Sequence, residues 1–136
     1  MYKKIMVAVD GSDTARQALE EAENIANTYN ATICIVHAIG NDSAVDQKNG
    51  EEILAGAASS VDVIAIETQL LTAEIEYGLN GIAEAIAKAA ADGEVDLLDV
   101  GTANRRGLER FFVGSVAEQL VAKVDSSILL VRPQTT

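Results

Sequence analysis

The stretch Ile5-Met6-Val7-Ala8-Val9-Asp10-Gly11-Ser12 decides the fold class of this chain. Five apolar residues in a row are typical of a strand that is buried on both faces, because a strand with one wet face alternates apolar and polar residues. Asp10-Gly11-Ser12 then ends the run with turn-forming residues. Apolar residues recur at helical spacing over 13–29, which predicts an amphipathic helix that Asn30 ends.

The same alternation of strand and helix continues along the chain. We predict strands over 33–39, 70–77, 95–100 and 128–131, helices from about Ile53 to Thr68 and over 82–91 and 116–124, and a polar loop over 40–50. The second helix competes with another interpretation, since Gly56 weakens it and residues 61–64 also fit a strand. The pattern predicts one α/β domain over 1–136: a doubly wound, five-stranded parallel sheet of order 3-2-1-4-5, with helices on both faces.

The two outer strands of this sheet differ in their patterns. Residues 70–77 alternate between apolar and polar side chains, as an edge strand with one wetter face does. Ile128-Leu129-Leu130-Val131 is wholly apolar, and such an edge invites pairing with another chain. We therefore expect a homodimer in which this last strand pairs with its own copy.

Composition excludes several classes of function. The net charge of −11 makes the chain a poor general binder of nucleic acid or of anionic membrane. No apolar run approaches the roughly 20 residues that a membrane helix needs. The single cysteine, Cys34, cannot form a disulfide within the chain and is expected in the core, and a reducing, cytoplasmic location fits it.

The predicted topology places a ligand site where the winding of the sheet reverses. For the order 3-2-1-4-5, this switch point lies between the first and fourth strands, at their carboxyl ends. The loops that follow these strands begin at Asp10 and at Gly101, and both are rich in glycine and small polar residues. The sequence therefore predicts one crevice bounded by these two loops.

The loop from Gly101 to Ser115 is suited to phosphate groups. Glycines let the backbone approach a ligand closely, and Gly114-Ser115 opens the last helix, whose free N–H groups favour anions. Three of the ten basic residues lie in this loop, namely Arg105, Arg106 and Arg110.

Structural alternatives stand beside each of these interpretations. Ser115 with Glu118 also forms a capping box, and the arginines also fit a solvated face. The structural alternative for Asp10 is that it initiates a turn. The functional alternative is that it accepts hydrogen bonds from a sugar or approaches a bound metal. His37, at the end of the second strand, is interpreted as structural. We predict no catalytic residue and no metal site built from protein side chains.

These residues resemble the universal stress protein family over essentially the whole chain. The resemblance rests on the opening residues 1–12, on Val36-His37-Ala38, and on Gly101-x2-Asn104-x9-Gly114-Ser115, which is similar to the family's nucleotide motif Gly-x2-Gly-x9-Gly-Ser/Thr. It implies a stress-linked regulator that binds ATP, with Mg²⁺ accompanying the triphosphate, and that hydrolyses ATP slowly at most. The binding residues that it implies are Ala8, Val9, Asp10, Ala38, Val100, Gly101, Thr102, Asn104, Gly114, Ser115, Val116 and Ala117.

Two residues depart from the family pattern. Asn104 replaces the second glycine of the motif, although Asn tolerates positive φ better than most residues. Asp99 stands in the fourth strand where the family has an aliphatic residue, so it requires a hydrogen-bond partner near the crevice, a proton, or a direct role. These departures favour one alternative, an interaction dimer of the same fold that has lost the nucleotide. A further alternative, which does not rest on them, is an enzyme that uses ATP for adenylation or slow hydrolysis.

Overall fold

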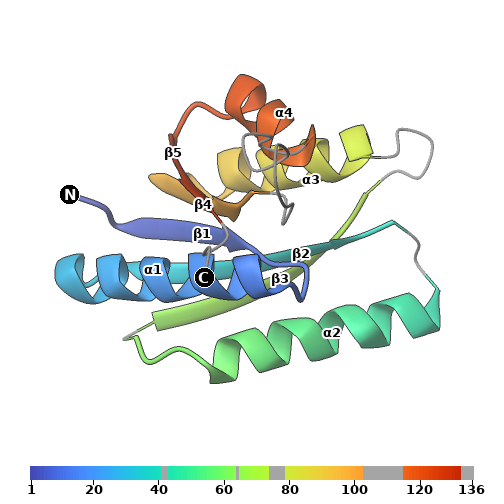
Figure 1. The fold of residues 1–136 in the computed structure, drawn as a ribbon, viewed down its shortest axis with the longest axis horizontal. Coiled ribbons are helices and arrows are strands. Elements are labelled where there is room, and N and C mark those ends of the chain that lie inside the picture. The colour runs from blue at the N-terminus through green and yellow to red at the C-terminus, as the bar shows by residue number, and fades with distance from the viewer. Residues whose placement is uncertain (41–42, 64, 74–78, 103–114, 133–136) are drawn as a thin grey trace.

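The computed structural model describes residues 1–40, 43–63, 65–73, 79–102 and 115–132. Strands and helices alternate throughout, as Figure 1 shows. Their bounds are β1 Lys4–Ala8, α1 Asp13–Tyr29, β2 Thr32–Ile39, α2 Ala44–Ser59, β3 Ala65–Thr72, α3 Leu79–Asp92, β4 Leu97–Gly101, α4 Ser115–Lys123 and β5 Ser127–Val131.

The five strands form one parallel sheet of order β3-β2-β1-β4-β5, which confirms the predicted fold class and strand order. Helices α1 and α2 cover one face of the sheet, and α3 and α4 cover the other (Figure 1). Each face has its own apolar core, and β1 contributes to both because its side chains alternate between them. Ile5 and Val7 point to the α1 side, whereas Met6 points to the α3 side.

Helix α1 has the predicted bounds because both ends carry the expected caps. Ser12 is the N-cap, and its Oγ accepts a hydrogen bond from the Ala15 N–H at 3.1 Å. Asn30 ends the helix in the left-handed conformation, with φ of 57°. A buried stripe of small residues and leucine, including Ala18, Leu19 and Ala22, holds the helix against the sheet.

The prediction for residues 40–68 was wrong in two places. Helix α2 begins at Ala44, inside the predicted loop, because the Oγ of Ser43 caps it by accepting from the Asp46 N–H at 3.2 Å. Its apolar stripe is weak, since its only buried residues are Gly50 and Leu54. The predicted helix to Thr68 ends early, and residues 65–72 form β3 instead.

Residues 65–69 of β3 were not predicted as a strand from the sequence, because this strand lies at the edge of the sheet. Glu67, Thr68 and Gln69 are exposed in succession, so neither an apolar run nor a clean alternation marks the strand. Its position at one edge agrees with the prediction. The last residues assigned to this strand from the sequence, 74–77, lie outside the described part of the chain.

Candidate functional site

A cavity of about 260 Å³ lies at the carboxyl ends of β1, β2 and β4, where the winding of the sheet reverses. Helices α3 and α4 close it from one side. Nine of the twelve residues that the sequence nominated line this cavity: Ala8, Val9, Asp10, Ala38, Val100, Gly101, Thr102, Val116 and Ala117. The structure thus brings together segments that lie about a hundred residues apart in sequence.

The other three predicted binding residues are Asn104, Gly114 and Ser115. Asn104 and Gly114 lie outside the described residues, as do Arg105, Arg106 and Arg110. Ser115 is the first residue of α4. The following residues of α4, Val116 and Ala117, reach the cavity.

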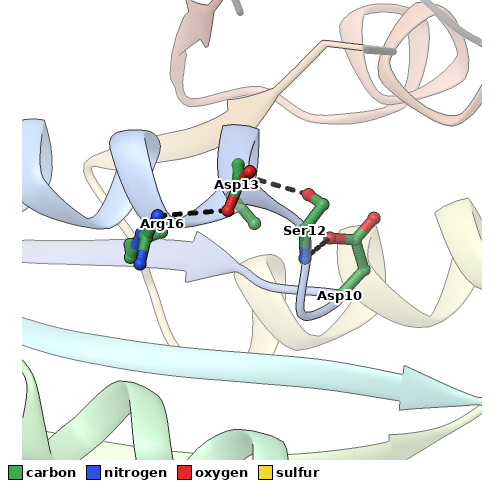
Figure 2. Close-up of polar contacts among 5 residues, drawn as sticks. Asp10, Ser12, Asp13 and Arg16 are labelled. Atoms are coloured by element: carbon green, nitrogen blue, oxygen red, sulfur yellow. Dashed lines mark hydrogen bonds and ion pairs between the residues drawn. The ribbon is translucent and has the colours of Figure 1, made fainter.

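The loop between β1 and α1 forms a polar rim of the cavity (Figure 2). Oδ1 of Asp10 accepts a hydrogen bond from the Ser12 N–H at 2.9 Å, so this carboxylate does initiate a turn. Gly11 completes the turn with φ of 86°, a conformation that favours glycine. Asp10 is exposed, and its Oδ2 has no hydrogen bond to another described residue. One carboxylate oxygen therefore shapes the loop, while the other accepts no hydrogen bond within the described part of the chain.

His37 also lines the cavity, at the end of β2. Its Nδ1 lies 2.7 Å from the carbonyl oxygen of Val9. A carbonyl oxygen only accepts, so Nδ1 carries the hydrogen and donates it. The structural interpretation of His37 agrees with this contact, which ties β2 to the residue that precedes Asp10.

Gly101 is required for a reason other than phosphate approach. A β-carbon at this position would lie 2.7 Å from Cγ2 of Thr14 and 3.1 Å from its carbonyl carbon. Glycine therefore lets α1 pack closely on the end of β4. Thr102, which follows it, is buried, and its N–H donates to the carbonyl oxygen of Val131 at 2.8 Å.

Asp99 does not belong to the cavity. Its neighbours in register, Val7 and Leu129, both lie in the core on the α1 side, whereas Val100 faces the cavity. Asp99 is fully buried, and neither carboxyl oxygen has a hydrogen-bond partner among the described residues. Burial raises the pKa of Asp99 to about 8, with a further contribution from the nearby carboxylate of Glu21. A neutral, protonated acid is thus the option that fits, and a partner or direct role at the crevice does not.

The sequence missed the deep wall of the cavity. Ile82 and Ile86 of α3 and Leu120 of α4 line it on the side opposite the strands. The spacing of four residues between Ile82 and Ile86 places both on one helical face, and this spacing is the signal in the sequence that could have indicated their shared position. Cys34 is buried in that same core, as predicted, and burial raises the pKa of its thiol.

The described residues contain neither a metal-binding cluster nor a helix that could span a membrane. No group of three or more His, Cys, Asp or Glu side chains in this part of the chain is arranged to hold a metal ion. Within the same residues, every helix is too short or too polar to cross a bilayer.

The fold is a doubly wound α/β sheet with a cavity at its switch point. The family model described as "Universal stress protein family" matches residues 1–132, and the chain belongs to this family. A putative universal stress protein of Staphylococcus haemolyticus is 33% identical, with 98% of this chain and 86% of the relative covered. A universal stress protein of Methanocaldococcus jannaschii is 29% identical, covering 97% and 83%.

Solved structures agree on the fold. A universal stress protein in complex with cAMP superposes with a TM-score of 0.77 at 24% identity, covering 96% of this chain and 97% of the other. The universal stress protein of Archaeoglobus fulgidus in complex with dAMP gives a TM-score of 0.74 at 24% identity, covering 96% and 98%. At this identity, the likeness establishes the shared fold.

Proposed function

We propose that the chain binds ATP together with Mg²⁺ in the cavity between the β1 and β4 loops and acts as a stress-linked regulatory protein. The observation that carries the proposal is the convergence of nine residues, implied for nucleotide binding by the family resemblance, on one cavity. The family members whose structures contain cAMP and dAMP support an adenine nucleotide as the ligand.

The shape and polarity of the cavity suit the adenosine half of the ligand. Ala8 and Ala38 leave room beside the strands, and Ile82 and Ile86 offer an apolar surface opposite them. A planar base is held well by apolar walls with few polar groups. The free oxygen of Asp10 at the rim can accept hydrogen bonds from ribose hydroxyl groups.

The phosphates would lie toward the β4–α4 side. Gly101, Thr102 and Asn104 would face the ribose and phosphates, and Gly114 and Ser115 would lie where α4 begins. The N–H groups and the positive dipole end of a helix start favour anions. Mg²⁺ would be held mainly by phosphate oxygens, because it keeps few protein ligands in such sites.

We further propose that turnover is slow at most. Among the described residues that line the cavity, only Asp10 and His37 are titratable. One oxygen of Asp10 is engaged by the Ser12 N–H, and His37 Nδ1 is engaged by the Val9 carbonyl. Asp10 would meet the ribose and His37 lies beside Ala38 at the end of β2, whereas the terminal phosphate would lie on the β4–α4 side, so neither group would meet a water that attacks it, and steady-state ATP hydrolysis should be negligible beside nucleotide binding.

We also propose a cytoplasmic homodimer that forms through β5, over Ile128 to Val131. This strand lies at the sheet edge, and Ile128, Leu129 and Leu130 are only half-buried in the single chain. A second copy of the strand would cover these side chains and pair with the backbone N–H and C=O groups at the exposed edge. Sedimentation at micromolar concentration tests the dimer, and a monomer mass would contradict it.

A second candidate function is an interaction protein that keeps the fold but has lost the nucleotide. Asn104, in place of the glycine of the motif, favours it, since a side chain there crowds a phosphate. The Asn104→Gly variant separates the two candidates. If the chain has lost nucleotide binding, Asn104→Gly should create or sharply improve ATP binding. If the first proposal is right, the parent chain already binds ATP.

The proposal is tested by denaturing the purified protein, analysing the released small molecules, and titrating the emptied protein with ATP and Mg²⁺. We expect an adenine nucleotide in the released fraction or saturable binding. Ala38→Leu should abolish binding by filling the cavity, whereas Ala55→Leu, on an exposed face of α2, should not. No nucleotide and no binding at millimolar ATP would reject the proposal.

A further inference from the structure

The residue before Asp10 is held by β2 from two directions. The Val9 N–H donates to the carbonyl oxygen of Val36 at 2.9 Å, as in a strand ladder. The Val9 carbonyl oxygen accepts instead from a side chain, through His37 Nδ1 at 2.7 Å. Residue pairing between the two strands ends at Ala8 and Val36, so the imidazole extends the hydrogen-bonded network by one peptide.

Helix α2 holds the imidazole from its other side. A β-carbon at Gly50 would lie 3.2 Å from Cδ2 of His37, 3.1 Å from Cγ2 of Ile39 and 2.6 Å from Cδ1 of Leu70. The backbone of α2 therefore packs directly against this part of β2 and β3. With Gly50 on one side and the Val9 carbonyl on the other, the ring has little freedom to turn away from its acceptor.

We propose that His37 is a positioning residue of the nucleotide site, which fixes the direction of the Asp10 carboxylate by holding the Val9 carbonyl. The inference rests on the proposed function, because it assigns His37 a task only when a nucleotide sugar meets Asp10. The free oxygen of Asp10 stays at the cavity rim only while the peptide before it keeps its orientation. His37 contributes this order before the ligand arrives, which lowers the entropic cost of binding.

The chemistry of the contact gives matched variants. His37→Leu removes the donor by replacing the imidazole with an apolar side chain of similar size. His37→Asn keeps a donor, because its Nδ2 occupies the same place relative to Cγ as Nδ1 of the ring. His37→Gln is polar, but it carries its amide nitrogen one atom further out. We expect His37→Asn to keep the affinity for ATP, and His37→Leu and His37→Gln to weaken it.

The experiment measures the Kd of ATP and of 2′,3′-dideoxy-ATP, each with Mg²⁺, by titration calorimetry. The dideoxy analogue lacks the hydroxyl groups that Asp10 would bind. We expect His37→Leu and His37→Gln to weaken ATP binding about tenfold and dideoxy-ATP binding less than about threefold, as coupled neighbouring residues do. His37→Asn should stay within about threefold of the parent for both ligands.

A double-mutant cycle with Asp10→Asn completes the test. Asn at this position keeps the acceptor for the Ser12 N–H but loses the second carboxylate oxygen. His37→Leu should add little to the loss already caused by Asp10→Asn, because it acts through that residue. Equal losses in both backgrounds, or equal losses for ATP and the dideoxy analogue, would overturn the inference and leave nucleotide binding standing. A parent protein that binds neither ligand would overturn the proposed function and this inference together.

Discussion

Replacing the buried acid Asp99 by its neutral isostere, Asp99→Asn, should stabilise the protein strongly near neutral pH. The side chain is fully buried between β4 and α1, and its oxygens have no hydrogen-bond partner in the described part of the chain. Burial raises its pKa from the ordinary value of 3.8 to about 8. The folded protein therefore holds a proton on Asp99 that the unfolded chain releases above about pH 4.

The magnitude follows from this proton linkage. Between the two pKa values, the free energy of unfolding loses about 1.4 kcal/mol for each unit of rising pH, because folding must take up one proton. The contribution of Asp99 is therefore most favourable below its ordinary pKa and is fully lost above the raised one. At pH 7 the accumulated cost is about 4 kcal/mol, and the Asn variant does not incur it.

Urea unfolding of the parent and of Asp99→Asn, at intervals from pH 4 to pH 8, measures this difference. The two free energies should be similar near pH 4 and diverge steadily, with the variant more stable by about 4 kcal/mol at pH 7. Asp125→Asn, at an exposed position, serves as the control and should follow the parent. Parallel curves for the parent and Asp99→Asn would refute a protonated acid at this position.

Two further variants test the packing around the site and the anchoring of β1. Gly101→Ala should cost about 1–3 kcal/mol in urea unfolding, because its β-carbon meets Thr14, whereas Gly56→Ala meets no atom and should not destabilise. A loss of stability in Gly56→Ala as large as in Gly101→Ala would contradict the packing argument. Asp96→Ala removes two hydrogen bonds, at 2.7 and 2.9 Å, from the backbone N–H groups of residues 3–4. These bonds lower the pKa of Asp96, so its contribution of about 1 kcal/mol, reduced by solvent screening, should be complete above the ordinary value of 3.8 and be lost as the pH falls from there through the lowered pKa. A difference in stability between the parent and Asp96→Ala that does not shrink between pH 6 and pH 2.5 would argue against this linkage.

The parts of the fold that the sequence predicted are those with strong local signals. Helix α1 has both caps and a clear apolar stripe, so its bounds are as predicted. The strand order followed from the alternation of strand and helix, the right hand of the crossovers, and the edge-like alternation of residues 70–77. Helix α2 has two buried residues and is held by a serine cap and a close glycine contact, which leave little periodicity in the sequence.

For the candidate site too, some features could be predicted from the sequence and others depend on contacts between separate elements. Topology alone predicted that the loops after β1 and β4 meet, because the carboxyl ends of parallel strands share one edge. The role of Gly101 in helix packing and the contact of His37 with Val9 depend on distances between separate elements. The face to which Asp99 points depends on the register of β4, and a shift of one residue would have turned it toward the cavity.

The most direct test of the proposed nucleotide site is a titration of the ¹⁵N-labelled protein with ATP and Mg²⁺, followed by amide chemical shifts. We predict saturable shifts at 8–10, 38, 100–102 and 116–117, the residues that line the cavity at the switch point. Ala38→Leu should remove these shifts. No shifts at millimolar ATP, or shifts confined to surfaces away from these residues, would contradict a nucleotide site between β1 and β4.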